Sequence, residues 1–549
     1  MDMPRRRTVS CAIMEKIHWH GTEAEMVGIY LNPGAGRFLT ARSSKIYVDK
    51  TALLGELDAV FGTEQRFVCV SRPRRFGKTM AANMVCAYYD RTVAVDVFSG
   101  LAIARGEGFS DKRGACDVLR INIQEFLSEA QNIEDLLQEL QEALLWELLG
   151  EYALLCYRRK DKLRLVMQTI YAATQRPFVI VIDEWDCIFR EYPHDTKAQR
   201  QYLDFLRDWL KDKEYVGLAY MTGILPVKKY GTHSALNMFT EYSMENPGPL
   251  APYVGFTEDE VRRLCEVYDM DFGECCAWYD GYAFPNCSHV FSPKSVVEAM
   301  LRREYDDYWT KTETYEALKV YIDLNEGGLR DAIVKMMAGG RQKINTLTFT
   351  NDMTTFTSAD DVMTLLVHLG YLGYDRREEE VFIPNNEILR EYIAATKQGE
   401  EWKIVSRAVQ ASDTLLTAVF EKDATAVAAG VEKAHLETSQ IQYNDENALS
   451  YTLSLAFYSA RRFYNIVREL PAGKGFADLV FLPRPQHAEK PALVIELKWD
   501  RTAQTAIRQI REKEYAGALA GYAGEVLLVG VSYDKKTRQH EAVIEEWRQ

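Results

Sequence analysis

The chain has 549 residues, of which 47% are hydrophobic and 27% charged, and this composition excludes disordered, collagen-like and low-complexity proteins. At this length we expect several domains instead of one compact core. Lys and Arg number 66 against 80 Asp and Glu, a formal charge of −14, which excludes a protein that coats nucleic acid with a broadly cationic surface.

The sequence also limits where the protein works. No apolar run approaches the roughly 18 residues that a membrane span needs. The N-terminal segment lacks the apolar core of a secretory signal, and the cysteines form no CxxC pair. We therefore expect a cytoplasmic protein with reduced thiols that does not enter a membrane.

Strands and helices alternate from about residue 45 to residue 244, which predicts an α/β domain with a largely parallel sheet. A helix with apolar residues at helical spacing begins at Lys78, and a long helical stretch interrupted near Gly150 follows the second strand. The predicted strands are 66–71, 118–123, 178–186, which ends in acidic residues, and 216–223.

The middle of the chain is predicted to be mainly helical from the GPLAP segment at 248–252 to about residue 345. Thr257 and Glu260 are spaced as a capping box, which indicates a helix start. A helix at 359–369, a hairpin at 374–384 and a helix at 386–396 then follow in an order that resembles a small winged-helix-like module. The hairpin tip RREEE is mostly acidic, so we expect this module to pack between domains and not to read DNA.

The last part of the chain reads as a separate α/β domain with the order α-β-β-α-β. The predicted elements are a helix at 446–464, strands at 476–483 and 492–500, a helix at 503–519 and a strand at 525–534.

The loop RPRRFGKT at residues 72–79 lies between a buried strand and a helix, which is the context of a phosphate-binding loop. Gly77 permits a close approach of the backbone, Lys78 can reach the β- and γ-phosphates, and the Thr79 hydroxyl can ligate Mg²⁺. Arg72 stands where such loops have their first Gly. Arg74 and Arg75 lie near the phosphates, where they act either as arginine fingers in cis or as solvated side chains. Backbone groups of Phe76 complete the predicted cradle.

The apolar part of the strand at 178–186 is followed by Asp183 and Glu184, so two carboxylates lie at the carboxyl end of a neighbouring strand, a Walker B arrangement. We expect Asp183 to hold Mg²⁺ through water and Glu184 to orient or deprotonate the attacking water. Thr222, at the end of the next strand, is placed to sense the γ-phosphate or the attacking water. The alternative is a nucleotide-free fold in which the two acids cap a helix.

The C-terminal domain has the pattern D-x17-E-x-K, formed by Asp478, Glu496 and Lys498. Residues two apart on a strand share one face, so Glu496 and Lys498 must point the same way, and an adjacent strand can bring Asp478 beside them. Two carboxylates can then bind Mg²⁺ or Mn²⁺, and Lys498 can orient a water for attack on a phosphodiester. The alternative, a surface salt bridge, is less favoured because the strand ALVIELK is apolar.

Other residues are weaker candidates. Glu446 could add a metal ligand, and Gln509, with Arg508 and Arg511, could hold the scissile strand. Five residues, Cys265, Cys275, Cys276, Cys287 and His289, match no usual zinc spacing and are better explained as buried thiols and a histidine.

Taken together, these motifs resemble a bacterial family in which an AAA-ATPase-like domain is fused to a PD-(D/E)XK nuclease-superfamily domain. The resemblance rests on YVDKT, RPRRFGKT with its Arg, IDEWD, MTGI, LNMFTEYS, GFTEDEV, WYDGYAF, IPNNEI and GKGFADLVF…VIELK…QI…KEY. Asp478, Glu496 and Lys498 match the nuclease core residue by residue, whereas Glu446 and Gln509 match less securely. Family members are suspected of roles in phage or mobile-element biology, which implies a defence function here.

The resemblance and the patterns together give an expected multidomain α/β organisation. Its parts are an N-terminal extension (1–44), an AAA-like P-loop NTPase domain (45–246), a helical lid or connector (247–345), a winged-helix-like module (346–400), a helical linker (401–435) and a restriction-endonuclease-like PD-(D/E)XK domain (436–549).

The resulting hypothesis is an ATPase, using ATP or GTP with Mg²⁺, whose nucleotide state controls cleavage of DNA or RNA by the C-terminal domain. The rival hypothesis is a nucleotide-switched binding or scaffold protein with an inactive nuclease fold. The intact Asp478, Glu496 and Lys498 argue against the rival. Assembly into a homo-oligomer is left open by the sequence.

Overall fold

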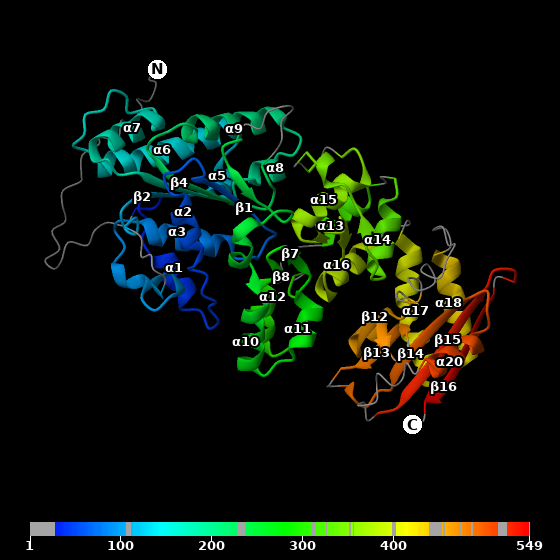
Figure 1. The fold of residues 1–549 in the computed structure, drawn as a ribbon. Helices are drawn as coiled ribbons and strands as arrows, with labels where there is room; N and C mark the ends of the chain where they lie inside the picture. The colour runs from blue at the N-terminus through cyan, green and yellow to red at the C-terminus, as the bar shows by residue number, and fades with distance from the viewer. Residues whose placement is uncertain are drawn as a thin grey trace, which may run out of the picture.

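The computed structural model describes residues 28–547, except 106–110, 228–235, 310–314, 325–326, 351–352, 355, 398–401, 439–452, 454–455, 473–474, 485–486, 514–523 and 538. Figure 1 shows an N-terminal sheet domain, a mainly helical middle and a C-terminal sheet domain in succession. No helix in these described ranges is both long and apolar enough to cross a membrane.

The N-terminal domain is built on a five-stranded parallel sheet in the order β2-β3-β4-β1-β5. The strands β1, β3 and β4 are buried along their whole length, which explains their continuous apolar sequences. The strands are β1 (Phe67–Ser71), β2 (Asp117–Asn122), β3 (Phe178–Asp183), β4 (Val216–Gly223) and β5 (Thr240–Tyr242). The predicted parallel α/β domain is confirmed.

One detail of the prediction is wrong: β3 is not the neighbour of β1, because β4 lies between them. The phosphate-binding loop and the acidic strand are therefore bridged by the end of β4, which carries Thr222.

Helices cover both faces of this sheet, with α1, α2 and α3 on one side and α6, α7 and α9 on the other (Figure 1). The predicted long helical stretch is divided into α5, α6 and α7. The helices of this domain are α1 (Gly36–Arg42), α2 (Leu53–Val60), α3 (Lys78–Tyr89), α4 (Ala102–Arg105), α5 (Ile123–Glu129), α6 (Ile133–Glu151), α7 (Leu163–Thr174), α8 (Cys187–Glu191) and α9 (Thr196–Leu210).

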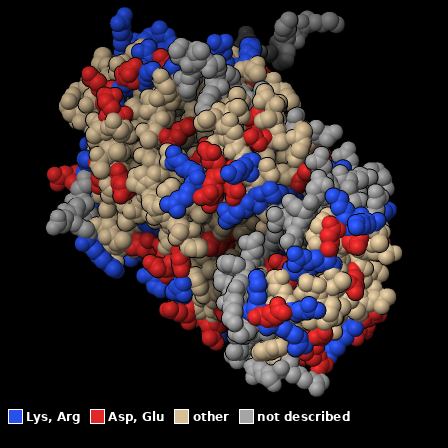
Figure 2. Space-filling view, turned by 45° about the vertical axis from the view of Figure 1, so that its right-hand side comes forward, with Lys and Arg blue, Asp and Glu red and all other residues tan. Residues whose placement is uncertain are grey.

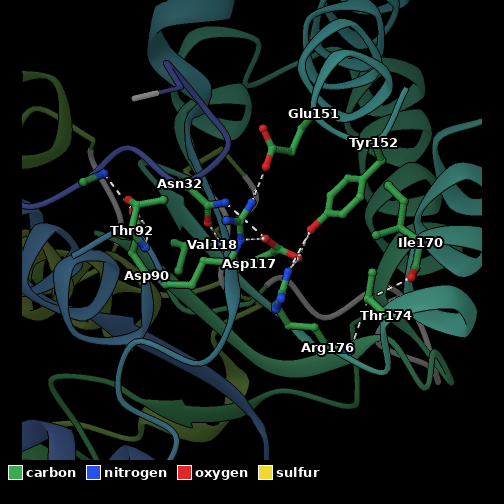
Figure 3. Close-up of polar contacts among 12 residues, drawn as sticks. Asn32, Asp90, Thr92, Asp117, Val118, Glu151, Tyr152, Ile170, Thr174 and Arg176 are labelled. Carbon is green, nitrogen blue, oxygen red and sulfur yellow. Dashed lines mark hydrogen bonds and ion pairs between the residues drawn. The ribbon is translucent and has the colours of Figure 1, made fainter. Parts of the chain in front are cut away.

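A buried cluster around Asp117 fastens the outer edge of this sheet (Figure 3). The fully buried Asp117 carboxylate accepts hydrogen bonds from Arg91 Nε at 2.7 Å, Tyr152 Oη at 2.5 Å and Asn32 Nδ2 at 3.1 Å. Arg176 Nη1 lies 3.5 Å from Asp117 Oδ2, the oxygen that also accepts from Tyr152. The side chain of Asn32 also accepts from the amide of Val118, so the cluster attaches the chain before α1 to the edge strand β2.

We expect Asp117→Ala to lower the free energy of unfolding by about 2–3 kcal/mol, because Arg91 Nε, Arg176 and the Tyr152 hydroxyl lose the acceptor that Asp117 supplies, although Arg91 keeps its pair with Glu151. The expected loss of stability is smaller than the roughly 3–5 kcal/mol that breaking a fully buried ion pair costs, because both arginines are partly exposed. Chemical unfolding of the two proteins checks the value. The exposed pair of Asp161 with Arg159 supplies the control, and Asp161→Ala should change stability by less than about 0.5 kcal/mol. Equal losses in both variants would contradict the role given to Asp117.

The middle region begins with a small unit in the part of the chain that the sequence predicted to be mainly helical. Its helices are accompanied by a three-stranded antiparallel sheet in the order β6-β8-β7. The predicted capping box is confirmed, with the Thr257 amide donating to Glu260 Oε2 at 2.8 Å. The elements of this unit are β6 (Phe256–Thr257), α10 (Glu258–Tyr268), α11 (Phe272–Tyr279), β7 (Tyr282–Phe284), β8 (Cys287–Phe291) and α12 (Pro293–Arg302).

The second half of the middle region contains the predicted helices at 359–369 and 386–396 and the hairpin between them. A short strand, β9, joins this hairpin in a sheet of order β10-β11-β9. The winged-helix-like assignment remains a prediction. The elements are α13 (Tyr315–Ile322), α14 (Leu329–Met337), β9 (Gln342–Lys343), α15 (Ala359–Leu369), β10 (Gly373–Asp375), β11 (Glu380–Phe382) and α16 (Asn386–Thr396).

The C-terminal domain is a five-stranded mixed sheet in the order β12-β13-β14-β15-β16, in which only β14 and β15 pair in parallel among the described strands. Helices α17 and α18 share a hydrophobic core with one face of the sheet, and α20 packs on the other face. The elements are α17 (Lys403–Phe420), α18 (Ala424–Thr438), β12 (Tyr464–Ala472), β13 (Gly475–Pro483), β14 (Ala492–Trp499), α20 (Ala503–Glu512), β15 (Val526–Asp534) and β16 (Gln539–Trp547).

Two strands of this domain, β12 and β16, are absent from the predicted α-β-β-α-β order. The helix predicted to reach Tyr464 is wrong at its end, because Tyr458–Arg462 is a 3-10 turn and β12 starts at Tyr464. The rest of that helix lies largely outside the described residues. The five boundaries between the six predicted segments stay predictions, although α17 and α18 pack with the C-terminal sheet and not as a free linker.

A buried ion pair joins the middle region to the C-terminal domain. Arg484, just after β13, donates to Glu274 on α11 at 2.6 Å, and both side chains are almost fully buried. Arg461 also donates to Asn386 on α16 at 3.5 Å. The unit that carries α11 therefore contacts the C-terminal domain directly.

Candidate nucleotide and metal sites

A cavity of about 610 Å³ lies where the N-terminal domain meets the unit of α10–α12. The loop after β1 forms its floor, since residues 74–79 all line it. Lys50, Tyr253 and Phe256 contribute to the other walls, and Glu184 reaches it from the end of β3. The structure thus places the predicted phosphate loop and the predicted water-activating acid on one cavity.

The loop between β1 and α3 contains two residues with a left-handed backbone. Gly77 has a φ of 90° and Arg75 a φ of 68°, so the chain turns sharply into α3. Lys78 Nζ donates to the carbonyls of Arg72 at 3.0 Å and Pro73 at 2.9 Å. Burial lowers the pKa of Lys78, and the nearby Glu184 and Asp186 oppose that shift. Lys78 therefore lies under the loop with acids close by, while Thr79 lines the cavity.

Arg72, at the place of the usual first Gly, is fully buried inside the protein. Its guanidinium donates to the carbonyls of Ser71 at 2.8 Å and Tyr242 at 3.0 Å, and it lies over the ring of Phe284 at 5.3 Å. Burial lowers the pKa of Arg72 to about 10. This arginine connects β1, β5 and β7 and is not among the residues that line the cavity.

The two neighbouring arginines line the cavity instead. Arg75 Nη1 donates to the carbonyl of Trp309 at 2.5 Å, and its guanidinium lies 5.5 Å from the centre of that indole. Arg75 therefore links the phosphate loop to the middle region. The role of Arg74 and Arg75 as arginine fingers in cis stays a prediction.

The acidic end of β3 is arranged around Asp183. The Thr222 hydroxyl donates to Asp183 Oδ1, so the structure brings these two predicted residues together. The other oxygen, Asp183 Oδ2, is buried and accepts no hydrogen bond from any residue that the structure describes. A buried carboxylate oxygen without a partner is costly unless a cation or water approaches it, so this oxygen fits a Mg²⁺ site.

Glu184 follows with a left-handed backbone (φ 53°) that turns its side chain toward the cavity. Its Oε2 accepts a hydrogen bond from Arg190 Nη2 at 2.5 Å. Burial raises the pKa of Glu184, an effect that Lys78 opposes. A carboxylate with a raised pKa is better suited to accept a proton from water than an ordinary surface glutamate.

Sequence reasoning missed two residues of this site, Asp186 and Arg190. Asp186 Oδ2 accepts from the amides of Ile224 at 3.0 Å and Leu225 at 2.9 Å, immediately after β4, and lies 3.6 Å from Arg190 Nε. The spacing of four residues between Asp186 and Arg190 was the only available signal, because it places the two on one face of a short helix.

In the C-terminal domain the structure brings Asp478, Glu496 and Lys498 together. Lys498 Nζ donates to Glu496 Oε1 at 2.9 Å, and Asp478 Oδ2 accepts from the amide of Leu497 at 2.7 Å. The main-chain pairing of β13 with β14 ends at Leu479 and Ile495, just before these residues. The carboxylate of Asp478 thus accepts the Leu497 amide, which a main-chain carbonyl would accept if the ladder continued.

Glu496 is 1% exposed, and its Oε2 is buried with no hydrogen-bond partner among the described residues. Burial, with the nearby Asp478 carboxylate adding to it, raises the pKa of Glu496 to about 7. An acidic pair with an unsatisfied oxygen is a suitable donor set for a divalent metal. The orphaned oxygens of Glu496 and Asp183 therefore give the two sites the same local chemistry.

The remaining predicted residues differ in outcome. Gln509 on α20 donates to Glu496 Oε1, so it is part of the constellation. Arg511 pairs with Glu545 at 2.6 Å, and Arg508 is exposed. Glu446 lies outside the described residues. In the described part of the chain no three His, Cys, Asp or Glu side chains gather into a metal-binding group. Of the four clustered cysteines, Cys265 and Cys275 are buried as predicted, whereas Cys276 and Cys287 are only partly buried.

Comparison with known proteins agrees with the motifs. Residues 37–232 match a family described as a predicted AAA-ATPase, and residues 445–543 match the PD-(D/E)XK nuclease superfamily. No curated protein matches the chain. Among solved structures, the crystal structure of Cdc6p from Pyrobaculum aerophilum is similar at 10% identity, over 66% of this chain and 96% of that chain, with a TM-score of 0.26. The chain thus combines a predicted AAA-ATPase domain with a C-terminal domain of the PD-(D/E)XK nuclease superfamily.

Proposed function

We propose that the protein is a metal-dependent nuclease whose cleavage of nucleic acid is controlled by ATP or GTP at the N-terminal domain. The observation that carries this proposal is the pair of orphaned carboxylate oxygens, Asp183 Oδ2 and Glu496 Oε2, each buried beside the residues that its motif requires. Bound Mg²⁺ would supply charge neutralisation at phosphate in both places and a more acidic water in the nuclease.

At the N-terminal site, Asp183 and Thr79 would hold the metal, and Lys78 would approach the β- and γ-phosphates. The cavity's apolar walls, which include Phe256 and Tyr253, would take the base. Glu184 would accept the proton of the attacking water, and Thr222 would contact that water or the γ-phosphate.

At the C-terminal site, Asp478 and Glu496 would hold the metal, with Glu446 as an additional ligand. Lys498 would orient the attacking water and stabilise negative charge on the phosphate in the transition state. Gln509 would fix the Glu496 carboxylate by its hydrogen bond. Glu496 and Lys498 both lie on the α20 face of β14, so their side chains point the same way, as their spacing on the strand requires.

Nucleic acid would have to reach this site without the help of a broadly basic surface. Figure 2 shows Lys and Arg interspersed with Asp and Glu on the face that it presents. We therefore propose that contacts with phosphates are local to the nuclease domain, with Arg508 as one of them.

Two contacts support control by nucleotide. Arg75 joins the phosphate loop to Trp309 in the middle region, and Arg484 joins α11 to the C-terminal domain. The α10–α12 unit contributes Phe256 to the cavity and Glu274 to that ion pair, so it contacts both the nucleotide cavity and the C-terminal domain.

The experiment that tests the function is incubation of the purified protein with labelled DNA and RNA, with and without Mg²⁺ or Mn²⁺ and with ATP, GTP or neither. We expect metal-dependent cleavage of one substrate and a change in its rate on adding nucleotide. Nucleotide binding without cleavage of any substrate would favour the switched scaffold instead.

A separate prediction concerns turnover of the nucleotide. Glu184→Gln should bind nucleotide as wild type does but hydrolyse it about 100-fold more slowly, because the amide keeps the shape and cannot accept the proton. Release of phosphate and equilibrium binding measure the two quantities separately. Hydrolysis at the wild-type rate would show that another group activates the water.

A further inference from the structure

Arg190 holds one oxygen of Glu184 in a fixed position. It lies on α8 with a side chain only 9% exposed, and its Nη2 donates to Glu184 Oε2 at 2.5 Å. Burial acts against its charge, but Asp186 and Glu184 outweigh that effect and raise the pKa of Arg190. The guanidinium is therefore charged at every pH at which the protein would work.

The second oxygen of Glu184 is left available. Oε1 accepts no hydrogen bond from any residue in the described ranges, and Glu184 lines the cavity of the phosphate loop. A glutamate has three rotatable side-chain bonds, so a single free oxygen would not by itself be aimed at one place. The bond to Arg190 removes much of this freedom, which leaves Oε1 as the oxygen able to meet a water.

Arg190 is itself anchored to the end of β4. Its Nε lies 3.6 Å from Asp186 Oδ2, and that oxygen accepts the amides of Ile224 and Leu225. The same strand ends in Thr222, whose hydroxyl donates to Asp183. The position of the Glu184 carboxylate is thus set by the same strand end that contacts the proposed metal ligand.

We infer that Arg190 is a positioning residue for nucleotide hydrolysis, which acts by holding the Glu184 carboxylate with Oε1 toward the attacking water. This inference rests on the proposed hydrolysis of ATP or GTP and adds a residue that neither the loop motif nor the acidic strand motif contains. Arg190 is not among the residues that line the cavity, and its Nη2 already donates to Glu184, so we assign it no direct contact with the nucleotide.

The test is steady-state kinetics of Arg190→Ala with Mg²⁺ and ATP. We expect kcat to fall by about 10- to 100-fold while KM and the Kd for ATP stay within about two-fold of wild type, because orientation is lost and binding is not. Arg190→Lys should recover part of the rate, since the ammonium replaces the charge but not both donors of the fork. The Arg190→Lys variant also retains a buried cation, so it can be measured even if Arg190→Ala folds poorly.

A double variant distinguishes positioning from a general structural effect. In the Glu184→Gln background, Arg190→Ala should cause no further loss of single-turnover rate, because Arg190 acts through the carboxylate that is already absent. Arg207→Ala is the matched control, since Arg207 forms an exposed pair with Asp204 on the next helix.

Different outcomes overturn different statements. An unchanged kcat in Arg190→Ala, or an equal loss of rate in the Glu184→Gln background, would overturn the inference and leave the proposed ATPase intact. Absence of hydrolysis by the wild-type protein, with ATP and with GTP, would overturn the proposed N-terminal activity and the inference with it.

Discussion

Glu496→Gln should lower the rate of metal-dependent cleavage by about 10³-fold or more, because it removes a charged ligand at a site where the carboxylate has no other cation except Lys498 among the described residues. Asp478→Asn should have a similar effect. Both variants should bind Mg²⁺ more weakly, which isothermal titration measures directly. Lys498→Ala should bind Mg²⁺ normally and lose rate, because its charge serves the water and the transition state.

The three residues act as one unit, so the triple variant should be scarcely slower than the slowest single variant. Glu489→Gln, an exposed glutamate before β14, is the control and should cleave like wild type. Cleavage that persists in EDTA, or that survives both Glu496→Gln and Lys498→Ala, would rule out this centre.

The raised pKa of Glu496, about 7, gives the same site a pH dependence. Metal binding requires the ionised carboxylate, so the apparent affinity for Mg²⁺ should fall by up to about tenfold for each pH unit below 7. In the metal-free protein, stability should decrease as the pH rises from 4.5 to about 7, because the unfolded chain ionises first. Both dependences should be weaker in Glu496→Gln.

Lys78→Met should raise the Kd for ATP by about 100-fold or more, which corresponds to about 2.7 kcal/mol. The reason is that the buried ammonium, next to the loop carbonyls of Arg72 and Pro73, is the cation best placed to meet the phosphates. Methionine fills most of the volume of the buried lysine side chain, so the substitution mainly removes the positive charge. Fluorescent nucleotide titration measures the affinity.

Lys197→Ala is a suitable control for this variant, because Lys197 lies on α9 and is 81% exposed. The thermal unfolding temperature without nucleotide should be recorded for both proteins. An unchanged Kd in Lys78→Met would exclude the proposed phosphate site, whatever its effect on stability.

The sequence predicted the elements that are long or strongly patterned. Buried parallel strands such as β3 read as continuous apolar runs, and α15 and α16 have clear caps at Ser358 and Asn385, so their limits agree with the structure. The strands that were missed lie at edges or in short hairpins. β16 contains Glu541, Glu545 and Glu546, and β12 contains Pro471. Charged residues and proline are common in edge strands, and both weaken the strand signal.

The candidate sites show the same division. Asp478, Glu496 and Lys498 were predictable because strand periodicity alone fixes which side chains share a face. Arg190 was not, since its contact with Glu184 depends on the left-handed backbone of that residue, which the sequence does not reveal. Asp117 was not, since its importance comes from partners on separate elements. Asp117, for example, depends on Tyr152 and Arg176, which are 35 and 59 positions away in a chain whose helices must first pack on the sheet.

The buried Arg72 changes how a degenerate phosphate loop should be understood. Its guanidinium fastens the end of β1 to Tyr242 of β5 and lies against Phe284 of the α10–α12 unit, so the loop is held from behind by a side chain that glycine cannot supply. Restoring the usual Gly at this place would bring the sequence closer to the common pattern while removing the fastening. A pattern search that requires this Gly would therefore discard this chain, in which Arg72 joins the phosphate loop to the α10–α12 unit.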